Sequence, residues 1–253
     1  MYLYFYTLLI VIMNLIIDIG NTNTKIAVFD KEEMLQKITT TYNMMHKNII
    51  KLQKKYTLKN CIVASVAKTN GNAIKMIEDI NTIIELNQKT KVPFQNQYKT
   101  PSTLGVDRIA LASAAISQYP NQNILVIDAG TCITYDFISA SKKYIGGAIS
   151  PGISMRYKAL HQFTANLPVL EPENFKLIGN DTQSAIHSGV LNGIIQEIDG
   201  VISQYQSKYS NLTVVLTGGD IIFLAKKLKS SIFATPNFLL EGLNSILIHN
   251  LNE

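Results

Sequence analysis

Residues 15–25 read LIIDIGNTNTK, and residues 125–135 read LVIDAGTCITY. In each segment an apolar stretch ends in Asp-x-Gly, and a threonine, Thr24 or Thr134, follows six positions after the aspartate. The apolar stretch predicts a buried β-strand, and the glycine predicts a turn into a second strand. Because the copies lie about 110 residues apart, too far for a solenoid period, they predict two lobes that are built alike.

The rest of the chain alternates between strand and helix patterns. Apolar β-branched runs at 27–29, 61–64 and 213–216 predict strands, and helical spacing predicts helices over 70–85, 107–119 and 181–205. This alternation is typical of an α/β fold in which helices cover the sheets. Pro120 should end the Ala-rich helix before it, so we expect an N-terminal lobe over 1–118 and a C-terminal lobe over 119–253.

Composition excludes several classes of protein. The chain has 253 residues, of which 47% are hydrophobic and 16% charged, which excludes a disordered tail or a coiled coil. Two cysteines, Cys61 and Cys132, cannot build a disulfide framework, so a reducing compartment is expected. The net charge of +5 is spread along the chain and predicts no nucleic-acid face. The four histidines have no metal-binding spacing.

The first seventeen residues, MYLYFYTLLIVIMNLII, are almost entirely apolar. They fall short of the roughly 20 residues that span a bilayer, and they lack the basic start and cleavage site of a signal peptide. We favour Met13 as the true start, with residues 1–12 an upstream addition and the ordered fold beginning near Asn14. A membrane anchor in residues 1–12 is the alternative; on the favoured reading there is no stable membrane insertion.

The segment from Asp18 to Lys25 has the residues of a phosphate site. Gly20 permits close backbone approach, and the N–H groups of such a turn can form an anion cradle. A carboxylate beside bound phosphate usually serves Mg²⁺, largely through water. The alternative is an ordinary Asn-rich hairpin. The segment after Asp128 offers the same chemistry, and Cys132 within it is interpreted as a packed side chain, since no histidine is near it in sequence.

Three further motifs carry candidate chemistry. Thr217-Gly-Gly-Asp ends a strand in two glycines, against which a flat ring or a ribose could lie. Gly105-Val-Asp-Arg opens a helix, where Asp107 could accept a hydroxyl proton and Arg108 could bind a carboxylate or phosphate. Residues 146–152, GGAISPG, predict a rigid loop. Each motif can also be an ordinary cap or turn.

Taken together, these motifs resemble the type III pantothenate kinases of the actin-like, hexokinase-like ATPase superfamily. The resemblance runs from Asn14 onward and rests on the order and spacing of the motifs, each of which is weak alone. Besides those above, it includes Tyr98 with Pro101, Thr164-Ala-x-Leu-Pro, Gly179-x-x-Thr and Leu240-Glu-Gly-Leu. The fold that the resemblance implies is α/β, with two ribonuclease-H-like lobes whose mixed sheets are flanked by helices.

The resemblance implies an enzyme that phosphorylates pantothenate with ATP to 4'-phosphopantothenate, the first step of coenzyme A biosynthesis, in the cytoplasm. Asp107 would be the general base. Residues implied to bind ATP are Asp18, Gly20, Asn21, Thr22, Asn23, Thr24, Lys25, Thr131, Gly218 and Gly219. Residues implied to bind pantothenate are Tyr98, Gly105, Val106, Asp107, Arg108 and Thr182.

The resemblance also implies cations and a partner. Asp128 would hold a monovalent cation, K⁺ or NH₄⁺, and Asp18 would serve Mg²⁺ through water. Members of the family are homodimers. Two other functions stay open, namely a kinase of the same superfamily that acts on another small molecule, and a nucleotide-binding regulator without catalysis.

Overall fold

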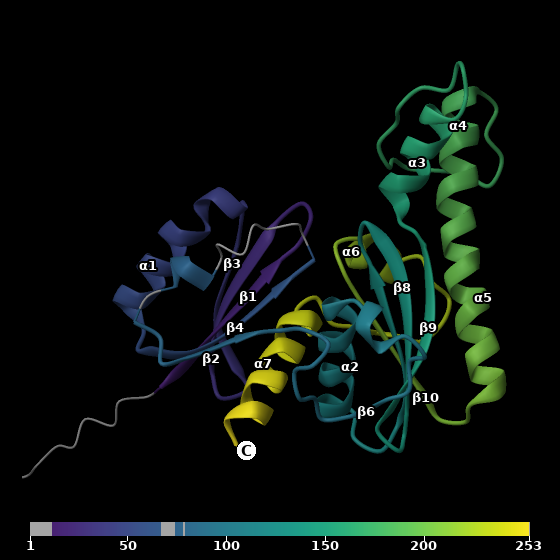
Figure 1. Ribbon diagram of the computed structural model, residues 1–253. Helices are drawn as coiled ribbons and strands as arrows, with labels where there is room; N and C mark the ends of the chain where they lie inside the picture. Colours follow the sequence, from purple (N-terminus) through teal and green to yellow (C-terminus); the bar gives the residue numbers. More distant parts are fainter. Residues whose placement is uncertain (1–11, 67–73, 78, 253) are drawn as a thin grey trace, which may run out of the picture. The chain divides into compact units, whose positions relative to one another are not determined.

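The computed structural model describes residues 12–66, 74–77 and 79–252. These residues form two compact units, which interleave along the chain (Figure 1). Unit 1 contains the described residues of Met1–Pro93, Ser102–Ser113 and Leu239–Glu253, and unit 2 contains Phe94–Pro101 and Ala114–Phe238. The apolar residues 1–11 lie outside the described part.

Unit 1 is built on a mixed five-stranded sheet of order β3-β2-β1-β4-β5. Its strands are β1 (Met13–Ile19), β2 (Thr24–Asp30), β3 (Glu33–Thr40), β4 (Leu58–Ser65) and β5 (Thr82–Glu85). Strand β1 runs antiparallel to β2 and parallel to β4. Helix α1 (Met45–Lys55) buries Met45, Ile49 and Leu52 in the core that β1, β2 and β4 also line. This spacing places the three side chains on one helix face.

The C-terminal helix α7 (Phe238–Leu251) lies almost wholly in unit 1. Asn244 is 2% exposed and joins this helix to strand β1 and to the turn between β2 and β3 through its side-chain amide. Its Oδ1 accepts a hydrogen bond of 2.9 Å from Asn14 Nδ2 on β1, and its Nδ2 donates to the Lys31 carbonyl oxygen at 2.7 Å. Asn14 accepts in turn from Asn60 on β4 at 3.1 Å. A buried amide chain of this kind fixes one helix position, because an unpaired amide there would be costly.

Unit 2 contains a mixed six-stranded sheet of order β11-β10-β7-β8-β9-β6. Its strands are β6 (Gln95–Asn96), β7 (Asn123–Ala129), β8 (Cys132–Ser139), β9 (Lys143–Pro151), β10 (Leu212–Thr217) and β11 (Phe233–Ala234). Its helices are α3 (Ile153–Gln162), α4 (Thr182–His187), α5 (Gly193–Lys208) and α6 (Ile221–Ala225). Figure 1 shows α3 and α4 gathered at one end of the long helix α5. The fold class predicted from the sequence, two mixed sheets flanked by helices, is confirmed.

Helix α2 (Val106–Gln118) crosses from unit 1 to unit 2 after Ser113 and ends before Pro120, as predicted. The helix predicted over 181–205 is present as α4 and α5, joined by a π-helical turn at Ser188–Asn192. The helix predicted over 70–85 is wrong where the chain is described, because residues 82–85 form strand β5 and Ile74–Met76 form a short 3₁₀ turn. Within the described ranges, no helix is both long and apolar enough to cross a membrane.

Candidate active site

The first Asp-x-Gly segment forms the hairpin between β1 and β2. Asp18 lies opposite Lys25, and Ile19 lies opposite Thr24, so residues 20–23 form the turn. The Gly20 N–H donates to the Asn23 carbonyl oxygen at 3.0 Å, and the side chains of Asn21, Thr22 and Asn23 are exposed. This turn therefore presents amide and hydroxyl groups to solvent directly beside a buried carboxylate.

The surroundings of Asp18 disfavour its charged form. It is 7% exposed, and burial raises its pKa above the ordinary value. The Lys25 ammonium, whose Nζ lies 3.7 Å from Asp18 Oδ2, opposes that shift, while the nearby charge of Asp107 adds to it. A carboxylate placed this way is stabilised by any further cation, which is the behaviour expected of an acid beside Mg²⁺-bound phosphate.

Asp107 and Arg108 lie in the first turn of α2, also in unit 1. Asp107 Oδ1 accepts a hydrogen bond of 2.9 Å from the Arg108 N–H. A Cβ at Gly105 would fall 2.3 Å from that same oxygen, so a side chain at position 105 would displace the carboxylate. Asp107 is half-buried, whereas Val106 and Arg108 are 8% and 5% exposed. Gly105 thus leaves room for the position that the Asp107 carboxylate occupies.

The second Asp-x-Gly segment forms the hairpin between β7 and β8 in unit 2. Here Asp128 lies opposite Thr134 and Ala129 opposite Ile133, so residues 130–132 form the turn. The Gly130 N–H donates to the Cys132 carbonyl oxygen at 2.9 Å. This turn is one residue shorter than the first. Thr24 and Thr134, which the sequence repeat equates, therefore occupy different register positions, one opposite Ile19 and the other opposite Asp128.

The loop after β10 lies against the second hairpin, because β10 and β7 are parallel and Thr217 is the register partner of Asp128. Gly218 has φ +100°, and a Cβ there would fall 2.3 Å from the Ala129 carbonyl oxygen and 2.5 Å from Asp128 Oδ1. The Asp220 N–H donates to that Ala129 oxygen at 3.0 Å. A Cβ at Gly219 would meet nothing within 4 Å, which leaves open space beside the loop.

The other side of the second hairpin rests on the end of β9. The Gly152 N–H donates to the Thr131 carbonyl oxygen at 3.1 Å. A Cβ at Gly152 would fall 2.1 Å from the Gly130 oxygen and 2.5 Å from the Thr131 oxygen. The rigid loop predicted from GGAISPG is in fact mostly strand β9, and its last glycine packs under the turn.

Tyr98 lies over the sheet of unit 2. Its ring packs beside Tyr144 at 6.1 Å between centroids and against Gly146, which has φ +125°. Tyr144 donates to Asp136 Oδ1 at 2.7 Å, and Thr134 donates to Asp136 Oδ2 at 3.0 Å. Sequence reasoning gave Asp136 no role, although a carboxylate between apolar strand residues is a signal for a buried hydrogen-bond centre. Asp136 is fully buried. It connects Tyr144, which packs beside Tyr98, to Thr134, the register partner of Asp128.

Thr182 begins α4 and is exposed. The residue before it, Asp181, caps the helix, since its side chain accepts from the Ser184 N–H at 3.0 Å and from the Ser184 hydroxyl at 2.8 Å. The pKa of Asp181 is lowered by these bonds, the backbone bond first. Thr182 thus belongs to the helical end of unit 2, whereas Asp128, Thr131, Gly218 and Gly219 belong to the hairpin group.

His, Cys, Asp and Glu side chains usually provide the ligands of protein metal sites. Across the described residues, no three His, Cys, Asp or Glu side chains gather as a metal cage. Magnesium that is bound mainly through substrate phosphates needs only one or two carboxylates, so Asp18 fits this mode. Of the histidines, His187 is buried and its Nδ1 lies 2.8 Å from the Tyr157 hydroxyl, the satisfied state expected for a core histidine.

A cavity of about 390 Å³ lies in unit 2 between β8, β9 and the end of α5. Phe137, Tyr205 and Tyr209 line it and also pack against one another. None of the residues predicted to bind ATP or pantothenate lines this cavity.

A family model described as "Type III pantothenate kinase" matches residues 14–204. A type III pantothenate kinase of Christiangramia forsetii is 48% identical over 243 residues, covering 95% of this chain and 100% of the relative. One of Flavobacterium johnsoniae is 48% identical over 247 residues, with the same coverage.

Among solved structures, a chain from Campylobacter jejuni described as a Baf family transcriptional activator is similar with a TM-score of 0.63 and 24% identity, covering 94% of this chain and 100% of that one. A glucokinase from an Antarctic psychrotroph is similar with a TM-score of 0.51 and 12% identity, covering 94% and 99%.

Proposed function

The chain belongs to the type III pantothenate kinase family, and from that premise we propose how its residues divide the work of the reaction. The enzyme phosphorylates pantothenate with ATP in coenzyme A biosynthesis. Phosphoryl transfer depends on positioning and charge stabilisation more than on covalent steps by the protein. The family match over residues 14–204 is the observation that supports the function. The two hairpins are the basis for the roles that we propose for individual residues.

Each hairpin, taken within its own unit, offers residues that we assign to ATP binding. Residues 20–23 present an exposed polar turn, and Thr24 and Lys25 follow on β2. On the second hairpin, a Cβ at Gly130 would meet nothing within 4 Å, so the space beside the Gly130 Cα is open to a phosphate oxygen. Gly218, which approaches Ala129 and Asp128 at the end of β7, would accept the nucleoside portion of ATP together with Gly219. Backbone N–H groups in such turns suit phosphate oxygens.

The residues also fit the two cations of the family. Asp18 is buried and its pKa is raised, so a divalent cation nearby would relieve its charge. Asp128 is half-buried, and its carboxylate and the Ala129 carbonyl oxygen both lie beside Gly218, so these two oxygens are the candidate ligands that we propose for K⁺ or NH₄⁺. When bound, such cations offset the negative charge of the transferring phosphoryl group.

Pantothenate carries a carboxylate and a primary hydroxyl, and residues of matching chemistry are available. Arg108 offers a planar donor fork for the carboxylate, with Tyr98 and Thr182 as hydroxyl donors and with Gly105 and Val106 shaping the start of α2. Asp107 acts as the general base and accepts the hydroxyl proton as the oxygen attacks phosphorus. The carboxylate is held in place by the Arg108 N–H.

We also propose a cytoplasmic homodimer. Four large apolar side chains between α3 and α4 are exposed, namely Phe163, Val169, Leu177 and Ile178, at 81%, 54%, 79% and 81%. Apolar side chains gathered in one segment favour a protein contact, and Thr182 lies just after them. The free thiols of Cys61 and Cys132 agree with a reducing compartment.

The experiment that tests the assignment is product analysis with a panel of acceptors. Purified protein, ATP and Mg²⁺ are incubated in potassium buffer with pantothenate, glucose or N-acetylmannosamine, and the products are identified by mass. We expect phosphorylated pantothenate and no sugar phosphate. Phosphorylation of a sugar alone would favour another kinase of the superfamily. ATP binding with no product, together with salt-dependent DNA binding, would favour a regulator.

A further inference from the structure

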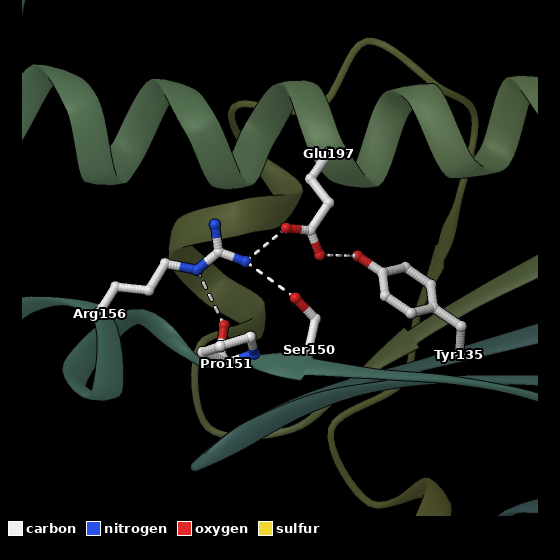
Figure 2. A network of polar contacts seen from close by, with 5 residues as sticks. All are labelled: Tyr135, Ser150, Pro151, Arg156 and Glu197. Carbon is white, nitrogen blue, oxygen red and sulfur yellow. Dashed lines mark hydrogen bonds and ion pairs between the residues drawn. The ribbon is translucent and has the colours of Figure 1, made fainter. Parts of the chain in front are cut away.

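Four elements of unit 2 meet in one polar network around Arg156 and Glu197 (Figure 2). Arg156 on α3 donates from Nε to the Pro151 carbonyl oxygen at 2.9 Å and from its terminal nitrogen to Ser150 Oγ at 3.0 Å. The same terminal nitrogen forms an ion pair with Glu197 on α5. The other Glu197 oxygen accepts from the Tyr135 hydroxyl at 2.9 Å. Two helices are thereby tied to strands β8 and β9.

The side chains of the network are largely shielded from solvent. The Arg156 and Glu197 side chains are 22% and 28% exposed, and Tyr135 is 1% exposed. Burial acts to raise the pKa of Glu197, but hydrogen bonds from Arg156, Ser150 and Tyr135 outweigh it and lower that pKa. The carboxylate is therefore charged at neutral pH. An Arg fork bound in two directions also resists displacement better than a point charge would.

Both strand ends of this network lead directly to the second hairpin. Pro151 is the register partner of Cys132, and the next residue, Gly152, holds the Thr131 carbonyl oxygen through its N–H. Tyr135 follows Thr134, the register partner of Asp128. A movement of Ser150 and Pro151 would therefore move the surface on which the Gly130–Thr131 turn rests. Partners at this remove from a bound group commonly set the orientation of the residues that touch it.

We propose that Glu197 and Arg156 are positioning residues that hold the second hairpin in the conformation that binds ATP and the monovalent cation. This inference rests on the proposed role of that hairpin. It adds two side chains from α3 and α5 that the sequence motifs do not contain. An ion pair that served stability alone would change the unfolding midpoint without changing ligand affinity.

The test is Glu197→Gln, which keeps the shape of the side chain and removes its charge. We expect the KM for ATP and the half-saturating K⁺ concentration to rise about tenfold, with the KM for pantothenate unchanged. The matched control is Asp199→Asn on the same helix. Asp199 accepts hydrogen bonds from the Lys229 and Ser230 N–H groups and from the Ser230 hydroxyl, none of which touches the hairpin. It should lower the melting temperature without changing either ATP or K⁺ dependence.

Two further variants keep the test decisive if Glu197→Gln folds poorly. Tyr135→Phe removes one hydroxyl, and Arg156→Lys keeps the charge while losing the fork; both should raise the KM for ATP, by a few-fold at least. Equilibrium binding of a fluorescent ATP analogue is measured in parallel. If the wild-type chain binds nucleotide but does not phosphorylate pantothenate, the substrate assignment fails. Nucleotide affinity of the variants then still tests the positioning role. Unchanged ATP and K⁺ affinity in folded variants would overturn the positioning role.

Discussion

The two Asp-x-Gly hairpins look alike in sequence and differ in how they are held. In the first, Asp18 is buried, its pKa is raised by burial, and the four-residue turn closes on itself through Gly20 and Asn23. In the second, Asp128 is half-buried, and the shorter turn is contacted from outside by Gly152 on one side and Gly218 on the other. The first hairpin thus carries a carboxylate whose charged form is disfavoured by burial, whereas the second is held by close packing and by hydrogen bonds from the Gly152 and Asp220 N–H groups.

We propose that this difference corresponds to two different cation roles. A carboxylate that is costly to ionise gains most from a divalent charge brought by its ligand, which suits Mg²⁺-bound phosphate. We propose that Asp128, which is half-buried at a hairpin contacted by neighbouring loops, serves the monovalent cation instead. The experiments below separate these two modes, beginning with a change that should leave both hairpins intact.

The largest expected effect is on the chemical step, outside both hairpins. Asp107→Asn removes the proposed base and should lower kcat by about 10²–10⁴-fold, because proton transfer by a positioned side chain contributes that much. Affinity for ATP should stay within a few-fold of wild type, as measured by equilibrium binding. Near-normal turnover would remove Asp107 from the role of base.

A smaller effect is expected from Gly218→Ala, which challenges the packing of the second hairpin. The new Cβ would lie 2.3 Å from the Ala129 oxygen and 2.5 Å from Asp128 Oδ1, at a φ of +100° that alanine rarely adopts. We expect kcat/KM for ATP to fall by at least about tenfold, since small misplacements of binding groups are costly.

The control for Gly218→Ala is Gly200→Ala within α5, where a Cβ meets nothing within 4 Å. It should leave activity unchanged and stabilise the helix by up to about 1 kcal/mol. Equal kcat/KM for ATP in the two variants would contradict the packing account.

The smallest expected effect is on stability, and it concerns the first hairpin. The pKa of Asp18 in the folded chain lies above its ordinary value of 3.8, so the folded state holds the proton more tightly than the unfolded state. Stability therefore falls as pH rises from 3.8 to the raised pKa, and the penalty is constant above it. Asp18→Asn removes this penalty, so the variant should lose activity yet melt at a higher temperature than wild type at neutral pH.

Thermal unfolding measured over a pH series checks this sign. The gain of Asp18→Asn should shrink as the pH approaches 3.8. Asp181→Ala is the opposite control, because the pKa of that capping carboxylate is lowered by its hydrogen bonds to Ser184, and its removal should lower the melting temperature at neutral pH. A lower melting temperature for Asp18→Asn at neutral pH would show that burial does not disfavour the charged form of Asp18.

The sequence was enough to predict both hairpins, the α/β class and helix α2, because each depends on local signals such as an apolar run, a glycine or a proline. It did not show that α7 packs in unit 1 through Asn244, since a contact between Asn14 and Asn244 leaves no local pattern. The lobe division at residue 118 stays a prediction. The residues of strand β5 are predicted as helix because a short apolar run fits both the helical and the strand periodicity.

The site was predictable to a similar degree. Asp18, Asp107 and Asp128 are marked by their motifs, and their roles stay proposals. The supports of the second hairpin were not predictable as such. Asp136 and Glu197 each act through partners on other strands or helices, and Gly152 was read as part of a loop although it packs under a neighbouring turn. Such partners become visible only when the strands are paired.

The proposal of two different cation roles for the hairpins is tested most directly by cation titration. ADP release with pantothenate is measured against K⁺, with Na⁺ keeping the ionic strength constant, for the wild type, Asp128→Asn and Asp18→Asn. The wild type should be active with K⁺ and nearly inactive with Na⁺ alone. Asp128→Asn should lose the response to K⁺, while the residual activity of Asp18→Asn should keep it. A wild type fully active in Na⁺, or an Asp128→Asn variant with the wild-type K⁺ response, would contradict the assignment.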